Sequence, residues 1–121
     1  VLFSSAAAQV GMANHGAISA AKSAVEGLAL AASSTYAKRG IRINTIAPGL
    51  TDTPMAESLL ADENRRAISD GMHPVGRVGR AEEVAKVASW LVSEAPDWMT
   101  GQVIGVDGGL AKLRSQETRK V

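Results

Sequence analysis

The chain has 121 residues, 45% hydrophobic and 21% charged, which suits one globular domain or part of one rather than a multidomain or disordered protein. Thirteen Lys and Arg residues against twelve Asp and Glu leave a net charge of +1, too balanced for nucleic acid or an anionic membrane surface as partner. The sequence contains no Cys and only two His, which excludes disulfides, thiolate chemistry and a His-rich zinc site.

The chain opens on an apolar triplet, Val1 to Phe3, which we interpret as part of a β-strand. No turn or cap precedes it, which favours a processed chain, a truncated chain or a fragment. The opening lacks the basic residues of a signal peptide, and no apolar run approaches the roughly 20 residues of a membrane-spanning helix. We therefore expect a cytoplasmic protein without a membrane partner.

A long helix is predicted from about Asn14 to Arg39, because this segment is rich in Ala and lacks Pro. Gly40 follows it, a residue suited to the left-handed conformation at a helix end. Small side chains occupy more than one face of this helix, so neighbouring backbones can approach it closely. We expect the helix to be buried on several sides.

A strand is predicted from Ile41 to Ala47, where β-branched residues alternate, and Pro48-Gly49 closes it with a turn. Two short helical pieces are predicted after this turn, from Met55 to Leu60 and from Asp62 to Ser69. In Thr53-Pro54, the Thr is suited to cap the first piece and the Pro to begin it.

An amphipathic helix is predicted from Arg80 to Val92, because apolar residues recur there at helical spacing. A last strand is predicted from Gln102 to Asp107, and Gly108-Gly109 ends it. The order strand, helix, strand, helices, strand favours an α/β fold with a parallel sheet covered by helices. Ligands bind beyond the carboxyl ends of such strands.

No conventional nucleotide-binding or esterase motif is present, such as G-x-G-x-x-G, G-x-x-x-x-G-K-[ST] or G-x-S-x-G. The sequence from Leu2 to Gly109 nevertheless resembles the carboxyl-terminal half of the short-chain dehydrogenase/reductase family. The resemblance rests on segments in the family's order: Ser5, Ala20–Leu28, Ile41–Gly49, the Thr51/Thr53 turn, Gly76–Gly79 with Glu82–Ala85, and Thr100–Gly109. It implies that residues 1–109 are the second half of a Rossmann-like domain, and we expect residues 110–121 to form a solvated basic tail.

The resemblance implies catalytic roles for two residues. In the family, a serine and a tyrosine hold the substrate oxygen, and a lysine binds the nicotinamide ribose and lowers the tyrosine pKa. Ser5 matches the serine and Lys22 the lysine, but Ile18 stands at the tyrosine position and cannot exchange a proton. His15 is a candidate replacement proton donor; the alternative is that it is only a polar residue near the helix start.

The turn from Pro48 to Thr53 resembles the family segment that meets the nicotinamide end of NAD or NADP. The resemblance implies cofactor contacts from Pro48, Gly49, Thr51 and Thr53, and an ordinary Pro-Gly turn with a Thr cap is the alternative. By the same resemblance, Thr53 to Pro74 covers the substrate. Four apolar residues there either line a pocket or pack the segment down: Met55, Leu59, Leu60 and Met72.

These features predict an NAD(P)-dependent oxidoreductase that acts on a small carbonyl or alcohol substrate. The resemblance further implies a homodimer or homotetramer formed through the Ala-rich helix. Two alternatives stay open, a catalytically silent homologue that serves as a structural or cofactor-binding subunit, and a fragment without activity of its own. Ile18 favours the silent homologue, whereas Ser5, Lys22 and the Pro48 turn favour the enzyme.

Overall fold

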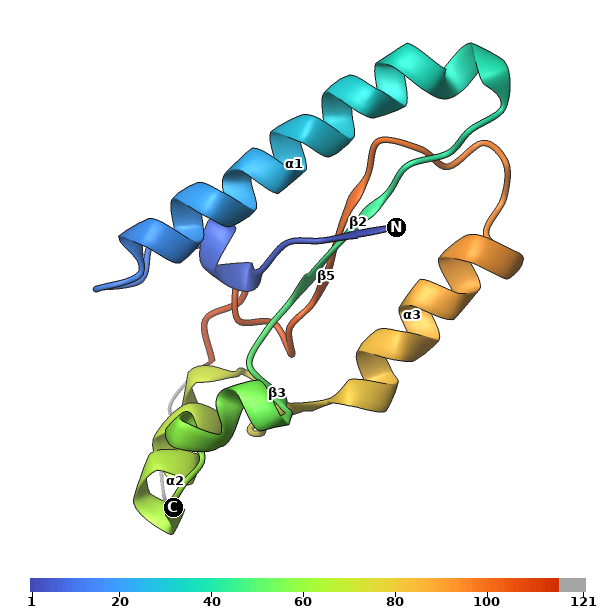
Figure 1. Cartoon of the computed structure of the whole chain (residues 1–121). Helices are drawn as coiled ribbons and strands as arrows, with labels where there is room; N and C mark the ends of the chain where they lie inside the picture. Colours follow the sequence, from blue (N-terminus) through green and yellow to red (C-terminus); the bar gives the residue numbers. More distant parts are fainter. Residues whose placement is uncertain (116–121) are drawn as a thin grey trace.

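A small parallel sheet forms the centre of the computed structural model, which describes residues 1–115 (Figure 1). Its strands are β1 (Leu2–Phe3), β2 (Thr45–Pro48) and β5 (Val103–Val106), in the order β1-β2-β5. Both pairs are parallel, with Leu2 opposite Thr45 and Thr45 opposite Val103. The predicted α/β class and parallel sheet are therefore confirmed.

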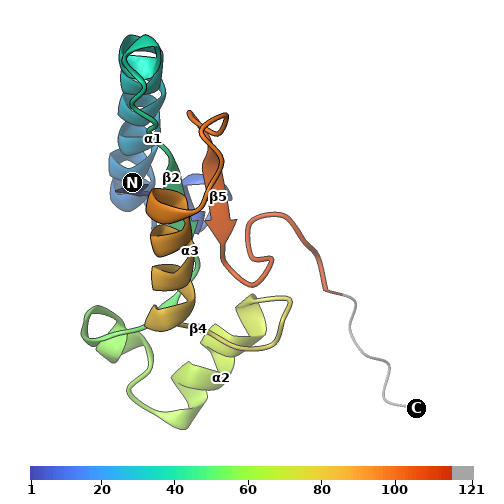
Figure 2. The same cartoon turned by 90° about the vertical axis from the view of Figure 1, so that its right-hand side faces the viewer.

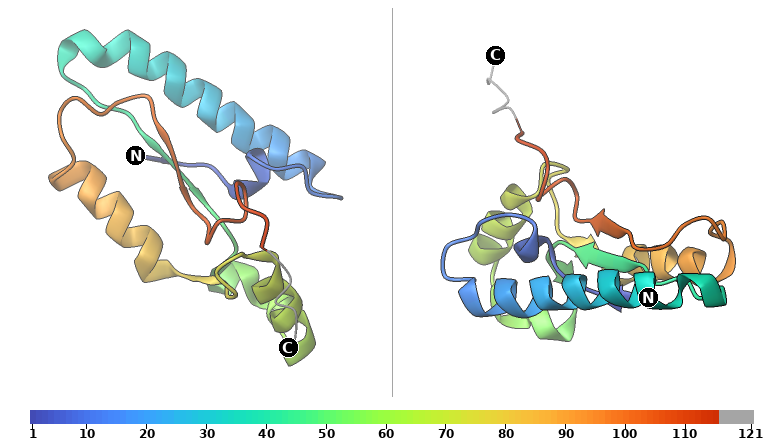
Figure 3. Two further views of the ribbon diagram at one scale, coloured as in Figure 1. Left: turned by 180° about the vertical axis from the view of Figure 1, so that it is seen from behind. Right: turned by 90° about the horizontal axis from the view of Figure 1, so that it is seen from above.

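Two helices lie on opposite sides of this sheet, α1 (Gly16–Tyr36) and α3 (Ala81–Ser93), as Figures 1 and 3 show. The core lies between β2 and α3, where Ile46 and Leu91 are almost fully buried. Apolar residues at helical spacing on α3 pack against this pair, namely Val84, Val87 and Ala88. The amphipathic helix predicted from Arg80 is thus present, with Arg80 as its cap residue.

The long helix α1 forms where it was predicted and ends through a 3₁₀ turn at Gly40, whose φ is +74°. The expectation that it is buried on several sides is wrong for this chain. Only Ala29 and Ser33 are buried, whereas Leu28 and Leu30 are each 63% exposed. The reason is that β1 and the adjoining turn cover one side of α1 only. Among residues 1–115, no helix is both long and apolar enough to cross a membrane.

The strand predicted to begin at Ile41 begins at Thr45 instead. The segment before it is held by the loop that precedes β5 rather than by a regular ladder. The buried Asn44 side chain donates to the Met99 carbonyl (3.0 Å) and accepts from the Gln102 amide (3.1 Å). These two hydrogen bonds of the Asn44 side chain hold the two segments side by side until regular strand pairing begins at Thr45.

Residues 53–78, which we call the lid segment, lie beyond the carboxyl ends of β2 and β5 (Figure 2). The chain enters and leaves this segment through two short parallel strands that were not predicted, β3 (Thr51–Asp52) and β4 (Gly79–Arg80). Between them lie the 3₁₀ helix η3 (Pro54–Leu59) and the helix α2 (Glu63–Met72).

The two predictions for the start of the lid segment, a Thr53 cap and a helix beginning at Pro54, differ in their outcome. Pro54 begins η3 as expected, but Thr53 makes no side-chain cap bond, since its hydroxyl donates to the Thr51 carbonyl at 3.4 Å. Asp62 caps α2 by accepting from the Arg65 amide at 2.8 Å. This cap lets α2 start as a regular helix after the break that follows η3.

The chain turns back on itself directly after β5. Asp107 accepts from the amides of Gly109 and Ala111, each at 2.9 Å, and the Leu113 amide donates to the Gly109 carbonyl at 2.8 Å. The first residues of the predicted basic tail thus form a turn. Residues 116–121 lie outside the described part, and with them Arg119 and Lys120 of that tail.

Candidate active site

A cavity of about 660 Å³ lies at the carboxyl edge of the sheet, beneath the lid segment. This volume suits a small organic ligand. The region after β1, the start of α1 and the turn after β2 form one side of it, with Ser5, His15, Ile18, Pro48, Gly49, Thr51 and Thr53 in its wall. The lid forms the other side with Met55, Leu59 and Met72, so these residues line a pocket, whereas Leu60 is not among the lining residues.

Ser5 occupies the cavity wall because it follows β1 by two residues and caps the 3₁₀ helix η1 (Ala6–Ala8). Its backbone is extended, and its Oγ accepts from the Ala7 amide at 3.1 Å. That bond uses a lone pair of the hydroxyl, so Ser5 can still donate its proton. The side chain is half-buried, which leaves it accessible to a ligand oxygen in the cavity.

Lys22 lies beside β1 rather than in the cavity wall. Its Nζ donates to the carbonyl of Phe3 at 3.2 Å, and the side chain is half-buried. The structure therefore brings Ser5 together with the Pro48 turn in one cavity. Lys22 lies on α1, with its side chain against the end of β1 and outside that cavity.

A polar network that the sequence analysis missed fixes the relation between β1 and α1. The buried Ser4 donates from its hydroxyl to Glu26 Oε1 at 2.5 Å, and Gln9 Nε2 donates to both carboxylate oxygens of Glu26 at 2.8 Å. Because Ser4 adjoins Ser5 and Glu26 lies one turn after Lys22, the network holds both candidate residues in place. The only signal in the sequence was a single acid in an Ala-rich helix.

The start of α1 places an imidazole and an alkyl group in the cavity wall. His15 precedes the first residue of the helix, and its Nδ1 lies 2.7 Å from the Ala13 carbonyl. A carbonyl can only accept, so Nδ1 carries the proton and Nε2 is the basic atom in the neutral ring. Ile18, 41% exposed, lies about one turn further along the helix. His15 and Ile18 therefore lie close together in the cavity wall.

The turn after β2 depends on Gly49 for a close approach of three segments. A Cβ at this position would lie 2.9 Å from Asp107 Cα and 2.9 Å from His73 Nε2, closer than atoms pack. The Gly49 amide donates to the Val106 carbonyl at 3.0 Å. The turn is therefore locked against the end of β5, and any larger residue would displace it.

The hydroxyls of this turn are oriented by its own backbone. Thr51 Oγ1 donates to the Gly49 carbonyl at 3.1 Å, and Thr53 Oγ1 donates to the Thr51 carbonyl. Their lone pairs can therefore accept from a ligand N–H, such as that of a nicotinamide carboxamide. These groups fit the nicotinamide end of a dinucleotide, with Pro48 and Gly49 as the backbone beside it.

His73 is a second residue that the sequence analysis left without a role. It is only 2% exposed and lines the cavity between the lid and the turn. Its Nδ1 lies 2.8 Å from the Ser69 carbonyl, and its Nε2 accepts from the Leu50 amide at 3.2 Å. A His beside a Pro between two predicted helices is typical of an exposed loop. No local pattern therefore indicated that the His73 side chain is buried.

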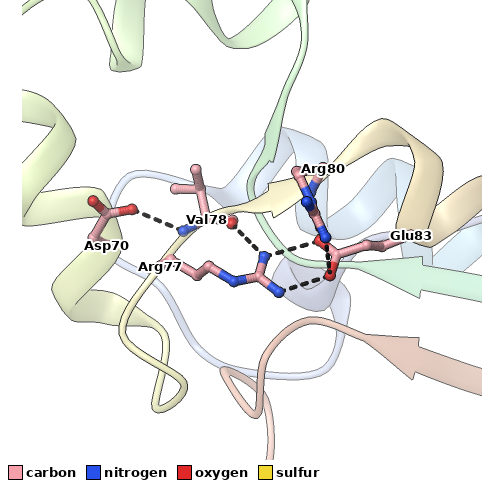
Figure 4. Close-up of polar contacts among 5 residues, drawn as sticks. All are labelled: Asp70, Arg77, Val78, Arg80 and Glu83. Atoms are coloured by element: carbon pink, nitrogen blue, oxygen red, sulfur yellow. Dashed lines mark hydrogen bonds and ion pairs between the residues drawn. The ribbon is translucent and has the colours of Figure 1, made fainter.

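An ion pair anchors the end of the lid segment to α3 (Figure 4). Arg77 donates from both terminal nitrogens to the Glu83 carboxylate, at 2.9 and 2.7 Å, and the Arg80 amide donates to the same group at 2.8 Å. The hydrogen bond from Arg77, then that from the Arg80 amide, lowers the pKa of Glu83 from its ordinary value of 4.5 to about 2. Asp70 adds a bond by accepting from the Val78 amide at 2.8 Å.

The residues at this site can bind an oxygen-containing organic ligand, but they do not gather metal ligands. Within residues 1–115, His, Cys, Asp and Glu nowhere form a group of three that could hold a metal ion. The fold and the site define an α/β protein with a ligand cavity at the carboxyl edge of a parallel sheet.

Comparison with known proteins places this architecture in a family. Residues 1–111 match the family model described as enoyl-(acyl carrier protein) reductase. The chain belongs to the short-chain dehydrogenase/reductase family and corresponds to its carboxyl-terminal region.

Two relatives illustrate the similarity. A cis-4-hydroxycyclohexanecarboxylate dehydrogenase from Sinomonas cyclohexanicum is 45% identical over 100 residues, 83% of this chain and 39% of that protein. A 3-oxoacyl-(acyl-carrier-protein) reductase from Thermotoga maritima is 44% identical over 91 residues, 75% of this chain and 36% of that protein. The chain thus spans less than half the length of these relatives.

Solved structures agree with this assignment. A short-chain type dehydrogenase/reductase from Mycobacterium ulcerans superposes with a TM-score of 0.84 at 34% identity, over 95% of this chain and 42% of that one. The angucycline C-6 ketoreductase LanV with bound NADP superposes with a TM-score of 0.82 at 29% identity, over 90% of this chain and 42% of that one. The predicted Rossmann-like half is therefore confirmed, and structurally similar proteins bind NADP.

Proposed function

We propose that this chain provides the substrate half of an NAD(P)-dependent oxidoreductase that interconverts a carbonyl and an alcohol. One observation carries the proposal: the Ser5 hydroxyl and the hydroxyl-bearing turn from Pro48 to Thr53 share one cavity beneath an apolar lid. A carbonyl oxygen can meet a hydrogen-bond donor there while the apolar wall excludes water. Relatives named as a hydroxycyclohexanecarboxylate dehydrogenase and a 3-oxoacyl-(acyl-carrier-protein) reductase support this chemistry.

Each candidate residue has a distinct task in this proposal. Ser5 donates to the substrate oxygen, Lys22 holds the ribose, and Thr51 and Thr53 orient the carboxamide of the cofactor. The reduced cofactor, when bound, supplies the hydride that adds to the carbonyl carbon. A protonated His15, reprotonated from solvent, donates the proton that completes the alcohol.

We further propose that this half works with a segment equivalent to the amino-terminal half of its relatives. The chain contains no glycine-rich phosphate turn, and β1 pairs with β2 on one side only. The exposed side of α1, which includes Leu28 and Leu30, suits a homodimer or homotetramer interface. Such an interface would cover the apolar side chains that the single chain leaves open.

A second function, a catalytically silent cofactor-binding subunit, is favoured by Ile18. Its alkyl group lines the cavity and cannot exchange a proton, and by resemblance we assign it to the position of the family's tyrosine. In that case the cavity and the turn are retained for binding, and turnover is absent. The two functions predict different results for Ile18→Tyr: only for the silent subunit would this substitution create turnover that the native protein lacks.

The test uses the protein expressed from its complete reading frame. NADH and NADPH oxidation is followed with a panel of small ketones and aldehydes for the native protein, Ser5→Ala, His15→Gln and Ile18→Tyr. We expect native turnover, with kcat/KM about 100-fold lower in Ser5→Ala because a donor to the developing charge is lost. Ser89→Ala, at an exposed site on α3, is the matched control and should leave turnover unchanged.

The outcomes separate the two functions. Native turnover that falls in Ser5→Ala but not in Ser89→Ala supports the enzyme, and a parallel loss in His15→Gln supports His15 as the proton donor. No native turnover, together with turnover gained in Ile18→Tyr, supports the silent homologue. Native turnover that is indifferent to Ser5→Ala would overturn the assigned site.

A further inference from the structure

His73 connects the lid segment to the turn after β2. It follows the last residue of α2, and its ring is 2% exposed between that helix and the turn. Gly49 approaches this ring closely, since a Cβ there would lie 2.9 Å from Nε2, and a Cβ at Gly108 would be in ordinary contact with the ring, 3.7 Å from Cδ2. Three segments distant in the sequence therefore meet at one imidazole.

Both ring nitrogens have partners that fix their roles. The Ser69 carbonyl can only accept, so Nδ1, at 2.8 Å from it, carries the proton. The Leu50 amide can only donate, so Nε2, at 3.2 Å, is the acceptor. One neutral tautomer satisfies both bonds, and the reverse tautomer satisfies neither.

The bond to Leu50 acts on the segment that faces the candidate nicotinamide site. Leu50 lies between Gly49 and Thr51, and the Gly49 carbonyl orients the Thr51 hydroxyl at 3.1 Å. The Leu50 carbonyl accepts from the Gly79 amide at 2.9 Å, and the Leu50 amide donates to His73. Both backbone groups of Leu50 are therefore held. Without the bond to His73, the half-buried Leu50 N–H in the cavity wall would lack this acceptor.

We propose that His73 is a positioning residue that fixes the turn from Pro48 to Thr51 for the nicotinamide end of the cofactor and ties it to lid helix α2. The proposal rests on the proposed cofactor site. His73 does not touch the reacting atoms. It acts through Leu50 on one side and through Ser69 on the other.

Two substitutions separate the two bonds. In His73→Gln, the side-chain oxygen reaches the place of Nε2 and accepts from Leu50, while the donor to Ser69 is lost. In His73→Asn, the shorter amide reaches the place of Nδ1 and donates to Ser69, while the acceptor for Leu50 is lost. The pair changes polarity and size in similar ways, so each variant is the matched control of the other.

The experiment uses the protein from its complete reading frame and measures NADPH binding by fluorescence, kcat and KM, and hydrogen exchange of the peptide that contains Leu50. We expect His73→Asn to weaken NADPH binding about tenfold, with faster exchange at the turn and a smaller change in kcat. We expect His73→Gln to restore binding to within about threefold of the native value. NMR of the labelled imidazole in the native protein should show Nδ1 protonated and Nε2 unprotonated.

Three results would overturn the proposal: the reverse tautomer by NMR, unchanged exchange at the turn in His73→Asn, or equal loss of NADPH binding in both variants. If either variant fails to fold, the tautomer of the native protein still decides whether the Leu50 bond exists. Native protein that binds neither NADH nor NADPH would refute the proposed function, and with it the role of His73 toward the cofactor. The exchange and NMR results would then still decide whether His73 holds the turn.

Discussion

Replacing Gly49 by Ala is expected to destabilise the protein by about 1 to 3 kcal/mol, because the added methyl overpacks a closed site. The Cβ would lie 2.9 Å from Asp107 Cα and from His73 Nε2, against the roughly 3.5–4.0 Å at which carbon atoms pack. One of these contacts is backbone, and the other is a ring held by two hydrogen bonds, so neither can move away cheaply.

The assay is urea unfolding of the complete protein, with thermal unfolding alongside it. A loss of about 2 kcal/mol corresponds to a Tm lower by about 4–8 °C in a chain of 150–250 residues. Gly71→Ala is the matched control, because a Cβ on that residue of α2 meets nothing within 4 Å. The control should gain about 0.5–1 kcal/mol from helix propensity. Equal stability of Gly49→Ala and the native protein would refute the close approach of turn, lid and β5.

Three further predictions concern the rest of the fold. Asn44→Leu should cost about 1 to 3 kcal/mol in urea unfolding, since the Gln102 amide loses its acceptor and the Met99 carbonyl keeps only the longer bond from Arg42 at 3.4 Å; an unchanged free energy of unfolding would contradict this. Because the folded pKa of Glu83 is depressed to about 2, the stabilisation from its pairing with Arg77 is complete above about pH 4.5 and declines as the pH falls toward 2. Glu83→Gln should therefore be less stable than native above pH 5 and converge with it near pH 2, whereas Glu82→Gln should track the native protein at every pH. The 121-residue chain alone should show no cooperative monomeric unfolding transition by circular dichroism, since β1 leaves an unpaired edge; a sharp transition would contradict this.

The helices were the predictable part of this fold because their signals are local. The Ala-rich composition and Gly40 located α1, and apolar spacing located α3. The pair of two-residue strands β3 and β4 gave no such signal, since segments this short show no alternation and their partners are distant in sequence. The start of β2 shifted for a similar reason: the side chain of Asn44 bonds a loop that no local pattern connects to it.

The residues of the candidate site also differed in how far they could be predicted from the sequence. The resemblance to a family located Ser5 and the turn at Gly49, which share the cavity. It could not indicate that Lys22 lies against the Phe3 carbonyl outside this cavity. His73 and Glu26 acquire their roles only through contacts between distant segments, and a single sequence does not display those contacts.

The lid segment begins and ends at nearly the same point, at the two-stranded sheet of β3 and β4. Thr51 lies opposite Gly79, and Asp52 lies opposite Arg80, so the two ends of the segment are neighbouring strands. A connection whose ends are already together can change length at little entropic cost, because that cost grows only with the logarithm of the loop length. Insertions or deletions between these strands would reshape the ligand cavity and leave the sheet intact, so evolution can alter specificity here without rebuilding the protein.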